Sequence, residues 1–420
     1  MRSLRVDDLK GQPIGGLVSG GLDSCTITHW LRSRGAAPHC FTVDLGQPDE
    51  PDLDAVRRRM LACGAATAHI LPGQAPLAEA GLKVIQAQAK YEGGYWNTTA
   101  IARYVTTRLG VEAMRKAGIT ILFHGATGRG NDQVRFQLAA NMLAPELRVY
   151  APWRDPAMLD TFGGRKEMVE YAGAYGLPIK ASVEQIYSTD ANMLGLTHEA
   201  GQLEDLATPA TLVTPEMGVW PHDAPDSPQT VRLTWRAGRP IALDGQELAL
   251  VDVFKAANRL AGAHGVGIGR HVVENRFVGI KSRGVYEAPG MELLGQAYEC
   301  LLQLFLDRRA RELFDHLARY LAVQIYQGYW YDLGTTAALA AVDRIAGQVS
   351  GTVALRLYKG NVVFEGATDL DDTAALYAAD EASMERAGSF DHADAEGFLG
   401  VLGVPARNYA TRMLPRLGRE

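Results

Sequence analysis

Short apolar runs alternate with amphipathic stretches over the first third of the chain. The apolar runs predict buried strands at residues 14–18, 39–44, 68–71 and 119–123. Between them, apolar residues recur at helical spacing, and the helices that this spacing predicts are 23–34, 51–63 and 99–117. A strand-helix-strand order favours a parallel sheet with helices on both faces, so we expect an α/β domain over residues 1–174.

The pattern changes from about residue 175. Apolar and polar residues now alternate at 231–235, 353–358 and 362–365, which predicts antiparallel strands. Long helices are predicted between these strands, including one over 292–320. We therefore expect a second, α+β domain over residues 175–368. The remaining segment, 369–420, is rich in Ala, Asp and Glu, and is the best candidate for an arm that packs on a neighbouring subunit.

Composition and charge exclude several classes of protein. With 420 residues, 47% of them hydrophobic and 21% charged, the chain is long enough for two domains of an ordinary globular protein. A net charge of -6 without long basic runs disfavours a nucleic-acid partner, and no apolar run reaches membrane-spanning length. The polar N-terminal segment and four widely separated cysteines, expected to be reduced, indicate a cytoplasmic location.

The segment Ser19-Gly20-Gly21-Leu22-Asp23-Ser24 lies between the first predicted strand and the first predicted helix. Its two glycines let the backbone turn tightly and approach an anion. The N-terminus of the helix supplies free N–H groups and a partial positive charge, and the serines add hydroxyl donors. Asp23 would repel phosphate unless it binds a Mg²⁺ ion that bridges the two. The segment therefore predicts a phosphate-binding loop.

A purely structural interpretation of this loop remains open, in which the glycines serve a strand-helix turn and Asp23 caps the helix. The loop is not of the Walker type, because the Gly-Lys ending is absent. The complete string resembles the loop of the N-type ATP pyrophosphatases. That resemblance implies that the loop holds the leaving pyrophosphate while the α-phosphorus of ATP is attacked, which makes AMP the expected nucleotide product.

Three further segments narrow the resemblance. They are His124-Gly125-Ala126-Thr127-Gly128-Arg129-Gly130-Asn131-Asp132-Gln133-Val134-Arg135, Val149-Tyr150-Ala151-Pro152-Trp153-Arg154 and Val273-Glu274-Asn275-Arg276-Phe277-Val278-Gly279-Ile280-Lys281-Ser282-Arg283-Gly284-Val285-Tyr286-Glu287. The first follows a predicted strand, where open α/β sheets bind ligands. Together, in this order, the three segments resemble the argininosuccinate synthase family over about residues 14–366, with a weaker similarity at 388–399.

The resemblance implies a ligase that condenses citrulline with aspartate at the expense of ATP. The ureido oxygen of citrulline would attack the α-phosphorus, and the aspartate amine would then displace AMP. It also implies Mg²⁺, a homotetramer, a role in arginine biosynthesis, an ATP pyrophosphatase domain over 1–174, a synthetase and multimerisation domain over 175–368, and an oligomerisation arm over 369–420.

Site residues are carried over from the family by position. The expected catalytic residues are Asp23, Asp132 and Arg135. Contacts to ATP are implied for Val18, Ser19, Gly20, Gly21, Leu22, Asp23, Ser24, Cys25, Val43 and Gly125. Contacts to aspartate are implied for Thr99, Thr127, Asn131 and Asp132. Contacts to citrulline are implied for Tyr95, Asn131, Arg135, Ser188, Thr197, Glu274 and Tyr286. Mg²⁺ would be held by the phosphates of ATP, with Asp23 as a candidate ligand.

The chain departs from the family pattern at several of these positions. In the loop, Ser24 and Cys25 stand where Thr and Ser are usual, and a thiol is a weaker donor than a hydroxyl. Val18 stands where Tyr is usual. Ala100 and Thr197 replace two serines that serve citrulline, and the lost hydrogen bond at Ala100 would weaken binding by about 1–3 kcal/mol. The aspartate site thus looks intact and the citrulline site edited.

Alternative functions therefore stay open. The acceptor could be another ureido, carbamoyl or amide compound, or the chain could be a catalytically weak homologue that binds ATP and amino acids. A sulfur-transfer enzyme that uses Cys25 and acts on RNA is disfavoured, because the sequence has neither a paired-cysteine motif nor a basic patch.

Overall fold

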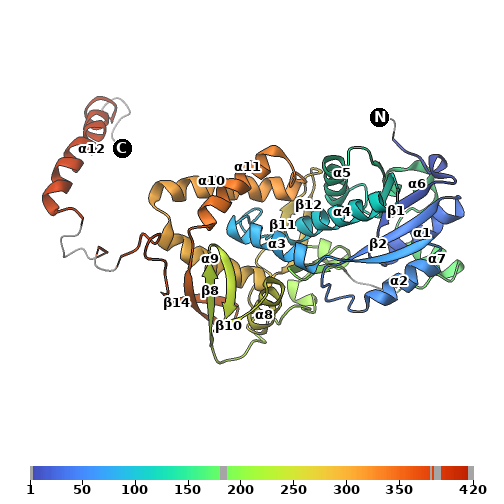
Figure 1. Cartoon of the computed structure of the whole chain (residues 1–420), viewed down its shortest axis with the longest axis horizontal. Coiled ribbons are helices and arrows are strands. Elements are labelled where there is room, and N and C mark those ends of the chain that lie inside the picture. Colours follow the sequence, from blue (N-terminus) through green and yellow to red (C-terminus); the bar gives the residue numbers. More distant parts are fainter. Residues whose placement is uncertain (1–2, 180–186, 379–380, 383–388, 415–420) are drawn as a thin grey trace.

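The first domain is built around a five-stranded parallel sheet in the order β3-β2-β1-β4-β5. The computed structural model describes residues 3–179, 187–378, 381–382 and 389–414. Figure 1 shows this sheet at one end of the molecule. The bounds of its strands are β1 (Pro13–Leu17), β2 (Ala37–Asp44), β3 (Thr67–Pro72), β4 (Ile121–His124) and β5 (Arg148–Tyr150).

Helices cover both faces of this sheet, as the sequence predicts. Side chains alternate between faces along a strand. Ile14 belongs to a buried cluster shared with α1 (Leu22–Ser33), α2 (Leu53–Ala62) and α7 (Arg165–Ala174). Leu17, three residues further along the strand, belongs to a second cluster shared with α4 (Thr98–Lys116) and α5 (Asp132–Leu143).

Two glycines keep the centre of this sheet thin. A side chain at Gly15 would meet Met114 of α4 at 2.6 Å, and one at Gly16 would meet the Phe123 ring at 2.2 Å. The absence of side chains at these positions leaves room for Met114 of α4 and for the Phe123 ring. The register of the parallel ladder, in which Leu17 lies opposite His124, places the ends of β1 and β4 side by side.

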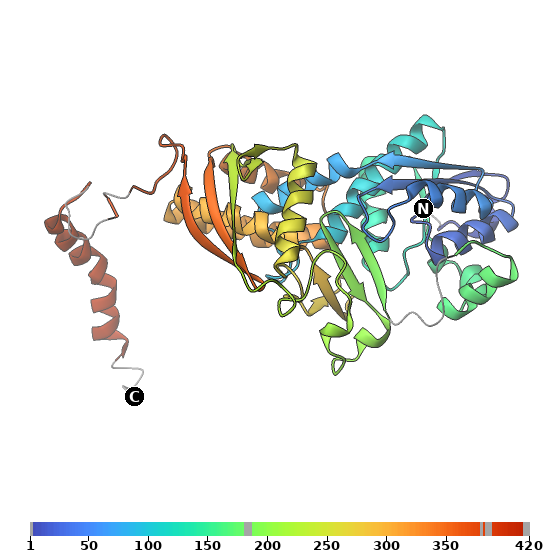
Figure 2. The same ribbon diagram turned by 90° about the horizontal axis from the view of Figure 1, so that it is seen from below.

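The second domain contains two antiparallel sheets, in the orders β10-β9-β8-β13-β14 and β11-β12-β7-β6. Figure 2 shows its long helices beside the strands of the larger sheet. Its strands are β6 (Ser188–Asn192), β7 (Gly195–Glu199), β8 (Gln229–Arg236), β9 (Arg239–Leu243), β10 (Gln246–Glu247), β11 (Val273–Asn275), β12 (Lys281–Glu287), β13 (Gly351–Tyr358) and β14 (Asn361–Thr368). Its helices are α8 (Leu250–Ala263), α9 (Pro289–Phe305), α10 (Arg308–Gln327) and α11 (Leu333–Ala346).

The predicted helix over 292–320 is wrong as a single element, because the chain forms two helices there. Leu306 is extended, with φ −101° and ψ 126°. The Asp307 side chain then caps α10 by accepting a hydrogen bond from the Ala310 N–H at 2.7 Å. Apolar periodicity continues across this break, so the pattern alone conceals it. A second element absent from the predicted set is α3 (Gln74–Gln86), which packs in the main buried cluster.

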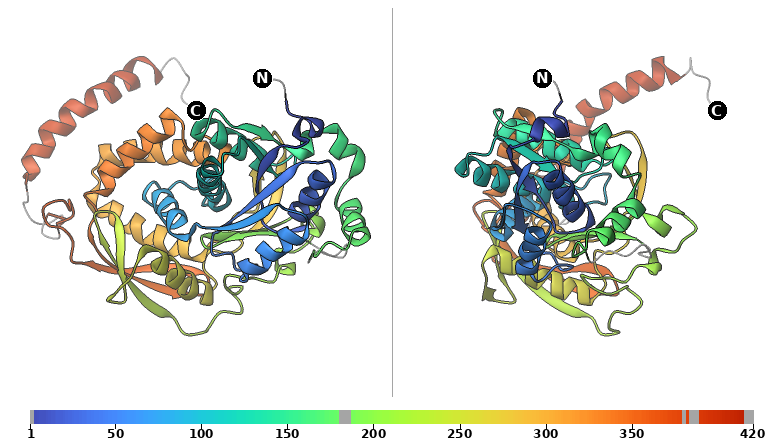
Figure 3. Two further views of the ribbon diagram at one scale, coloured as in Figure 1. Left: turned by 45° about the vertical axis from the view of Figure 1, so that its right-hand side comes forward. Right: turned by 90° about the vertical axis from the view of Figure 1, so that its right-hand side faces the viewer.

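The last part of the chain divides into a packed segment and an isolated helix. The backbone N–H groups of Leu376 and Tyr377 both donate to the Leu304 carbonyl of α9. By contrast, α12 (His392–Arg412) has no buried residue and stands away from the body of the molecule (Figures 1 and 3). Across the described ranges, no helix has the length and apolar character needed to cross a membrane.

Gly16→Ala is expected to destabilise the protein, because its methyl group would collide with the Phe123 ring. Overpacking of this kind lowers the free energy of unfolding by about 1–3 kcal/mol. Gly173→Ala in α7 is the matched control, since its methyl group would meet no atom within 4 Å. Alanine there should stabilise the helix by about 0.5–1 kcal/mol. Denaturant unfolding measures both shifts, and equal stabilities would contradict the packing around β1.

Candidate active site

The phosphate loop joins β1 to α1 and is shaped by its own hydrogen bonds. Gly20 has φ +78°, a conformation that favours glycine. The Ser24 hydroxyl accepts from the Ser19 N–H at 3.0 Å and lies 3.3 Å from the Ser19 hydroxyl. Because the residue that precedes the helix is Gly21, it offers no side chain to cap the first N–H groups of α1. These N–H groups are therefore available to an anion such as phosphate.

Asp23 lies on the first turn of α1, next to the end of β4. The Trp153 indole N–H donates to its carboxylate at 3.1 Å, and a side chain at Gly125 would lie 3.5 Å from the Asp23 Cβ. Burial raises the pKa of Asp23, although the charge of Arg165 partly opposes this. A cation beside Asp23 would favour the charged carboxylate, so the residue fits Mg²⁺.

The described residues contain no group of three or more His, Cys, Asp and Glu side chains that could hold a metal ion by themselves. A Mg²⁺ ion here would therefore take most of its ligands from the phosphates. The sequence does not indicate the hydrogen bond between Trp153 and Asp23, which are 130 residues apart in the chain.

Cys25, which stands where the family usually has Ser, contacts the phosphate loop from inside the protein. It is fully buried, and its thiol donates to the Gly20 carbonyl at 3.4 Å. Val18 and Val43 are also buried, Val18 beneath the loop and Val43 in the main cluster that joins the two domains. Val18 continues the ladder beyond β1, because its N–H donates to the Phe41 carbonyl at 3.1 Å. Contacts from these residues to ATP stay predictions.

Several residues predicted to contact citrulline, the proposed acceptor substrate, share one face of the smaller antiparallel sheet. We call this sheet, β11-β12-β7-β6, the acceptor sheet and this side of it the acceptor face. Asp190, Thr197 and Tyr286 stand directly across from one another on β6, β7 and β12. Ser188 and Glu199 form the next row on the same face, two residues along each strand. Glu274 on β11 lies opposite Ser282 on β12 in the strand register. Ser282 is four residues before Tyr286 on the same strand, so Glu274 faces the same side of the sheet as Tyr286. The sheet register thus gathers residues that are far apart in the sequence.

The N-terminal turn of α5 supplies a compact group of charges. Arg135 donates to the Asp132 carboxylate at 2.8 Å, and the Arg103 Nε donates to its other oxygen at 2.8 Å. Burial raises the pKa of Asp132, but the two guanidinium groups outweigh it and lower this pKa to about 2. Arg103 also donates to Asp190 on β6 at 2.5 Å. Arg103 therefore connects α4, α5 and the acceptor sheet, a role that sequence analysis missed.

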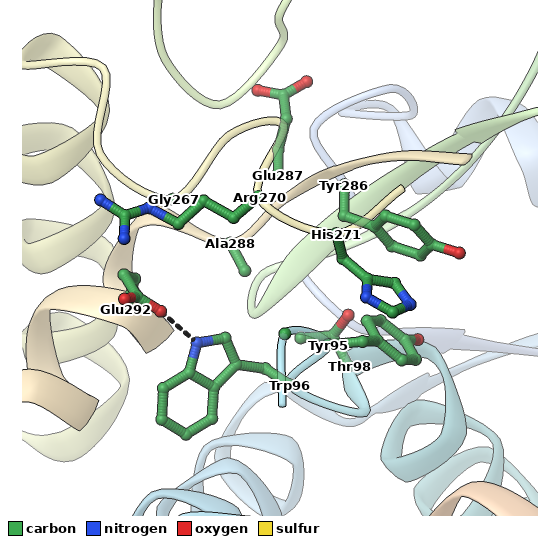
Figure 4. Close-up of a pocket in the computed structure, with 11 residues that line it drawn as sticks. Tyr95, Trp96, Thr98, Gly267, Arg270, His271, Tyr286, Glu287, Ala288 and Glu292 are labelled. Atoms are coloured by element: carbon green, nitrogen blue, oxygen red, sulfur yellow. Dashed lines mark hydrogen bonds between the residues drawn. The ribbon is translucent and has the colours of Figure 1, made fainter. Parts of the chain in front are cut away.

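Four buried tyrosines line the adjacent space: Tyr91, Tyr95, Tyr286 and Tyr326. The Tyr91 and Tyr326 rings stack with centroids 3.6 Å apart. Burial raises the pKa of Tyr95 to about 12, so its hydroxyl remains protonated. Figure 4 shows the Tyr95 and Tyr286 rings on one side of a small cavity, with Trp96 hydrogen-bonded to Glu292 on the other. The cavity of about 20 Å³ has room for about one water molecule.

Arg135 and Asn131 both contact Tyr326 at the end of α10. Arg135 donates to the Tyr326 carbonyl at 3.0 Å, and its guanidinium lies 4.9 Å from the centre of that ring. The Asn131 amide donates to the Tyr326 hydroxyl at 2.7 Å and accepts from the Phe277 N–H at 2.9 Å. Asn131 is therefore occupied by the protein, and its contact with either substrate stays a prediction.

The remaining predicted residues differ in exposure. The Thr99 N–H donates to the Tyr95 hydroxyl at 3.0 Å, which places Thr99 beside the tyrosines. Thr127 is exposed in the loop between Gly125 and Asn131. Ala100 is fully buried within the main hydrophobic cluster. The serine hydroxyl that Ala100 lacks would therefore lie inside a packed hydrophobic cluster.

Comparisons with known proteins agree with this arrangement. The model of the arginosuccinate synthase N-terminal HUP domain matches residues 17–178, and that of the C-terminal domain matches residues 187–409. A protein named argininosuccinate synthase from Rhodopirellula baltica is 42% identical over 391 residues, which is 93% of this chain and 96% of the relative. The chain belongs to the argininosuccinate synthase family. Its HUP-type domain is the one that carries the parallel sheet and the phosphate loop.

Likeness to solved structures is weak. A predicted tRNA methyltransferase subunit from Methanocaldococcus jannaschii aligns with a TM-score of 0.27 and 16% identity, over 39% of this chain and 76% of that chain. A Leishmania major tyrosyl-tRNA synthetase with tyrosinol aligns with a TM-score of 0.18 and 13% identity, over 80% of this chain and 48% of that chain. Scores this low carry no argument about the fold or the site.

Asp23→Asn is expected to stabilise the ligand-free protein and to lower kcat by about 100-fold. Because burial raises the pKa of Asp23, the charged carboxylate is less stable in the folded chain than in the unfolded one. Asparagine removes this charge and keeps an oxygen for the Trp153 indole. A rise in Tm of roughly 2 °C is expected at pH 7.

The pH dependence of this gain tests its cause. A raised folded-state pKa destabilises the wild type only where the unfolded aspartate is ionised, which is above about pH 3.9. The gain in Tm should therefore grow as the pH rises above that value and disappear as the pH falls below it. Thermal unfolding at a series of pH values measures it, and a gain independent of pH would contradict the explanation.

Proposed function

We propose that this chain condenses L-citrulline with L-aspartate and cleaves ATP to AMP and pyrophosphate. The observation that carries the proposal is the state of the Arg135 side chain. Its guanidinium is buried, and among the described residues its Nη2 has no hydrogen-bond partner. An unpaired buried guanidinium N–H is strongly unfavourable, so this position is suited to the carboxylate of an amino acid. The phosphate loop supplies the separate binding site for ATP.

The proposed reaction has two steps and needs no protein nucleophile. The ureido oxygen of citrulline forms a bond to the α-phosphorus, and the bond from that phosphorus to pyrophosphate breaks. The aspartate amine then attacks the ureido carbon, and AMP leaves with the former ureido oxygen. One proton is lost from the amine. The chain contributes by holding three ligands in position and by stabilising charge on the phosphates.

Charge complementarity supports the positions proposed for the two amino acids. The carboxylates of Glu199 and Glu274 both pair with Arg276, at 2.7 Å and 3.4 Å, on the acceptor face of the sheet. Glu274 also suits the ammonium group of citrulline, at the opposite end of that molecule from the ureido group. Asp132 stays ionised because Arg103 and Arg135 lower its pKa, and it suits the ammonium group of aspartate.

Three finer statements belong to the same proposal. Mg²⁺ accompanies ATP, with Asp23 as one ligand beside the phosphates. The enzyme acts in the cytoplasm, which is consistent with its four free cysteines. The oligomer is a homotetramer, and α12 is the arm that packs on another subunit.

Isotope transfer tests the proposed intermediate directly. Citrulline labelled with ¹⁸O in the ureido group should give AMP that carries one ¹⁸O atom, because the ureido oxygen remains on the α-phosphorus. Mass spectrometry of AMP from a reaction in unlabelled water measures this. Unlabelled AMP would contradict the adenylated intermediate.

The acceptor is tested by comparing citrulline with other ureido, carbamoyl and amide compounds at saturating ATP and aspartate. Citrulline is expected to have the highest kcat/KM. Preference for another compound would identify a different acceptor. Tight binding of ATP without turnover of any acceptor would instead identify a binding protein.

Assembly through α12 is tested by placing charges on its apolar side. Leu399 and Leu402 are more than half exposed and lie one turn apart. Leu399→Asp combined with Leu402→Asp should dissociate the tetramer into smaller species, as measured by light scattering. Asn408→Asp on the same helix adds a charge at a polar position and should leave the mass unchanged. A monomeric wild type would contradict the proposal that α12 packs on another subunit.

A further inference from the structure

The carbonyl group of Gly20, in the middle of the phosphate loop, is held from behind by α2. The Arg59 Nη1 donates to this carbonyl oxygen at 2.8 Å. The Cys25 thiol donates to the same oxygen at 3.4 Å. A side chain at Gly20 would meet Val56 of α2 at 2.6 Å and Arg59 at 3.0 Å. The loop therefore packs directly against α2 at this point.

Arg59 differs from its neighbours on the same helix. Arg57 is half-buried and Arg58 is exposed, and both form ion pairs with Asp54 within α2. Arg59 is buried, and its side chain is only 8% exposed. Its charge is paired with Glu50, at 3.2 Å. An arginine buried in this way needs specific partners, and the phosphate loop itself is one of them.

The geometry of the peptide bond gives this contact a consequence for ATP. In a planar trans peptide, the carbonyl and the following N–H point in opposite directions. Arg59 holds the Gly20 carbonyl toward α2, so the Gly21 N–H points away from α2. On that side the Gly21 N–H donates to the Ser19 hydroxyl, at 3.4 Å. The Gly21 N–H and the Ser19 hydroxyl that it contacts thus lie on the side of the loop opposite α2, where the proposed phosphate would bind.

We propose that Arg59 is a positioning residue for the pyrophosphate portion of ATP. It fixes the orientation of the Gly20–Gly21 peptide and places a positive charge behind the loop. Arg59 does not need to touch the nucleotide for either effect. The inference rests on the proposed binding of ATP at this loop, and it adds a residue from α2 that the loop sequence does not contain.

Direct binding measurements test the inference without catalysis. Affinities for ATP, inorganic pyrophosphate and AMP are measured by calorimetry for wild type, Arg59→Met and Arg59→Lys. Arg59→Met should weaken binding of ATP and pyrophosphate by about 10- to 100-fold, the range expected for a hydrogen bond to a charged group. Binding of AMP, which lacks the pyrophosphate, should change by less than about twofold. Arg59→Lys keeps the charge and should show a smaller loss.

Arg58→Met is the matched control, because it removes the adjacent, exposed arginine from the same helix. It should leave all three affinities unchanged. If Arg59→Met does not fold, as judged by its Tm, Arg59→Lys decides the question. A pyrophosphate affinity equal to that of wild type, or an equal loss for AMP, would overturn the inference. A wild type that binds neither ATP nor pyrophosphate would overturn the proposed function instead.

Discussion

The ion pairs around Asp132 are the interaction on which the rest of the site depends. One carboxylate lies between the guanidinium groups of Arg103 and Arg135, and Arg103 continues to Asp190 on the acceptor sheet. Removing one partner from such a group leaves an uncompensated charge in a poorly solvated place. The helices of the first domain and the small sheet of the second must therefore assemble together for the site to exist.

The two halves of the proposed site offer different groups for binding. The phosphate loop offers backbone N–H groups at the start of a helix, so its proposed function depends on conformation more than on side-chain identity. The half proposed for citrulline offers carboxylate, guanidinium and hydroxyl groups from several elements. The departures from the family pattern are consistent with this division. Cys25 and Val18 are buried under the loop, and Thr197 keeps its hydroxyl on the acceptor face.

The sequence predicts the first domain well because local signals agree there. The glycines Gly20 and Gly21, a buried strand and an amphipathic helix all indicate the same strand-loop-helix unit, which the structure confirms. The break between α9 and α10 was missed because apolar spacing continues across it and only the Asp307 cap marks it.

The site was less predictable, because its composition depends on tertiary contacts. Arg103 and Tyr326 occupy ordinary helical positions, and only the packing of α4 against α5 and α10 gives them partners. Family resemblance predicted the residues that contact the substrates. It does not indicate which of them already form hydrogen bonds to other residues of the protein. Asn131 is such a case. The proposed domain boundaries at residues 174 and 368 stay predictions.

The strand order β3-β2-β1-β4-β5 has a consequence for how the enzyme's specificity can change. From β1 the chain winds toward one edge of the sheet through β2 and β3, and then continues on the other side of β1 with β4 and β5. At this topological switch point the connections after β1 and β4 leave in opposite directions, which opens a crevice at the ends of these strands. The crevice is a property of the winding and not of any side chain in it. Residues on the acceptor side can therefore be exchanged during evolution while the nucleotide site remains in place.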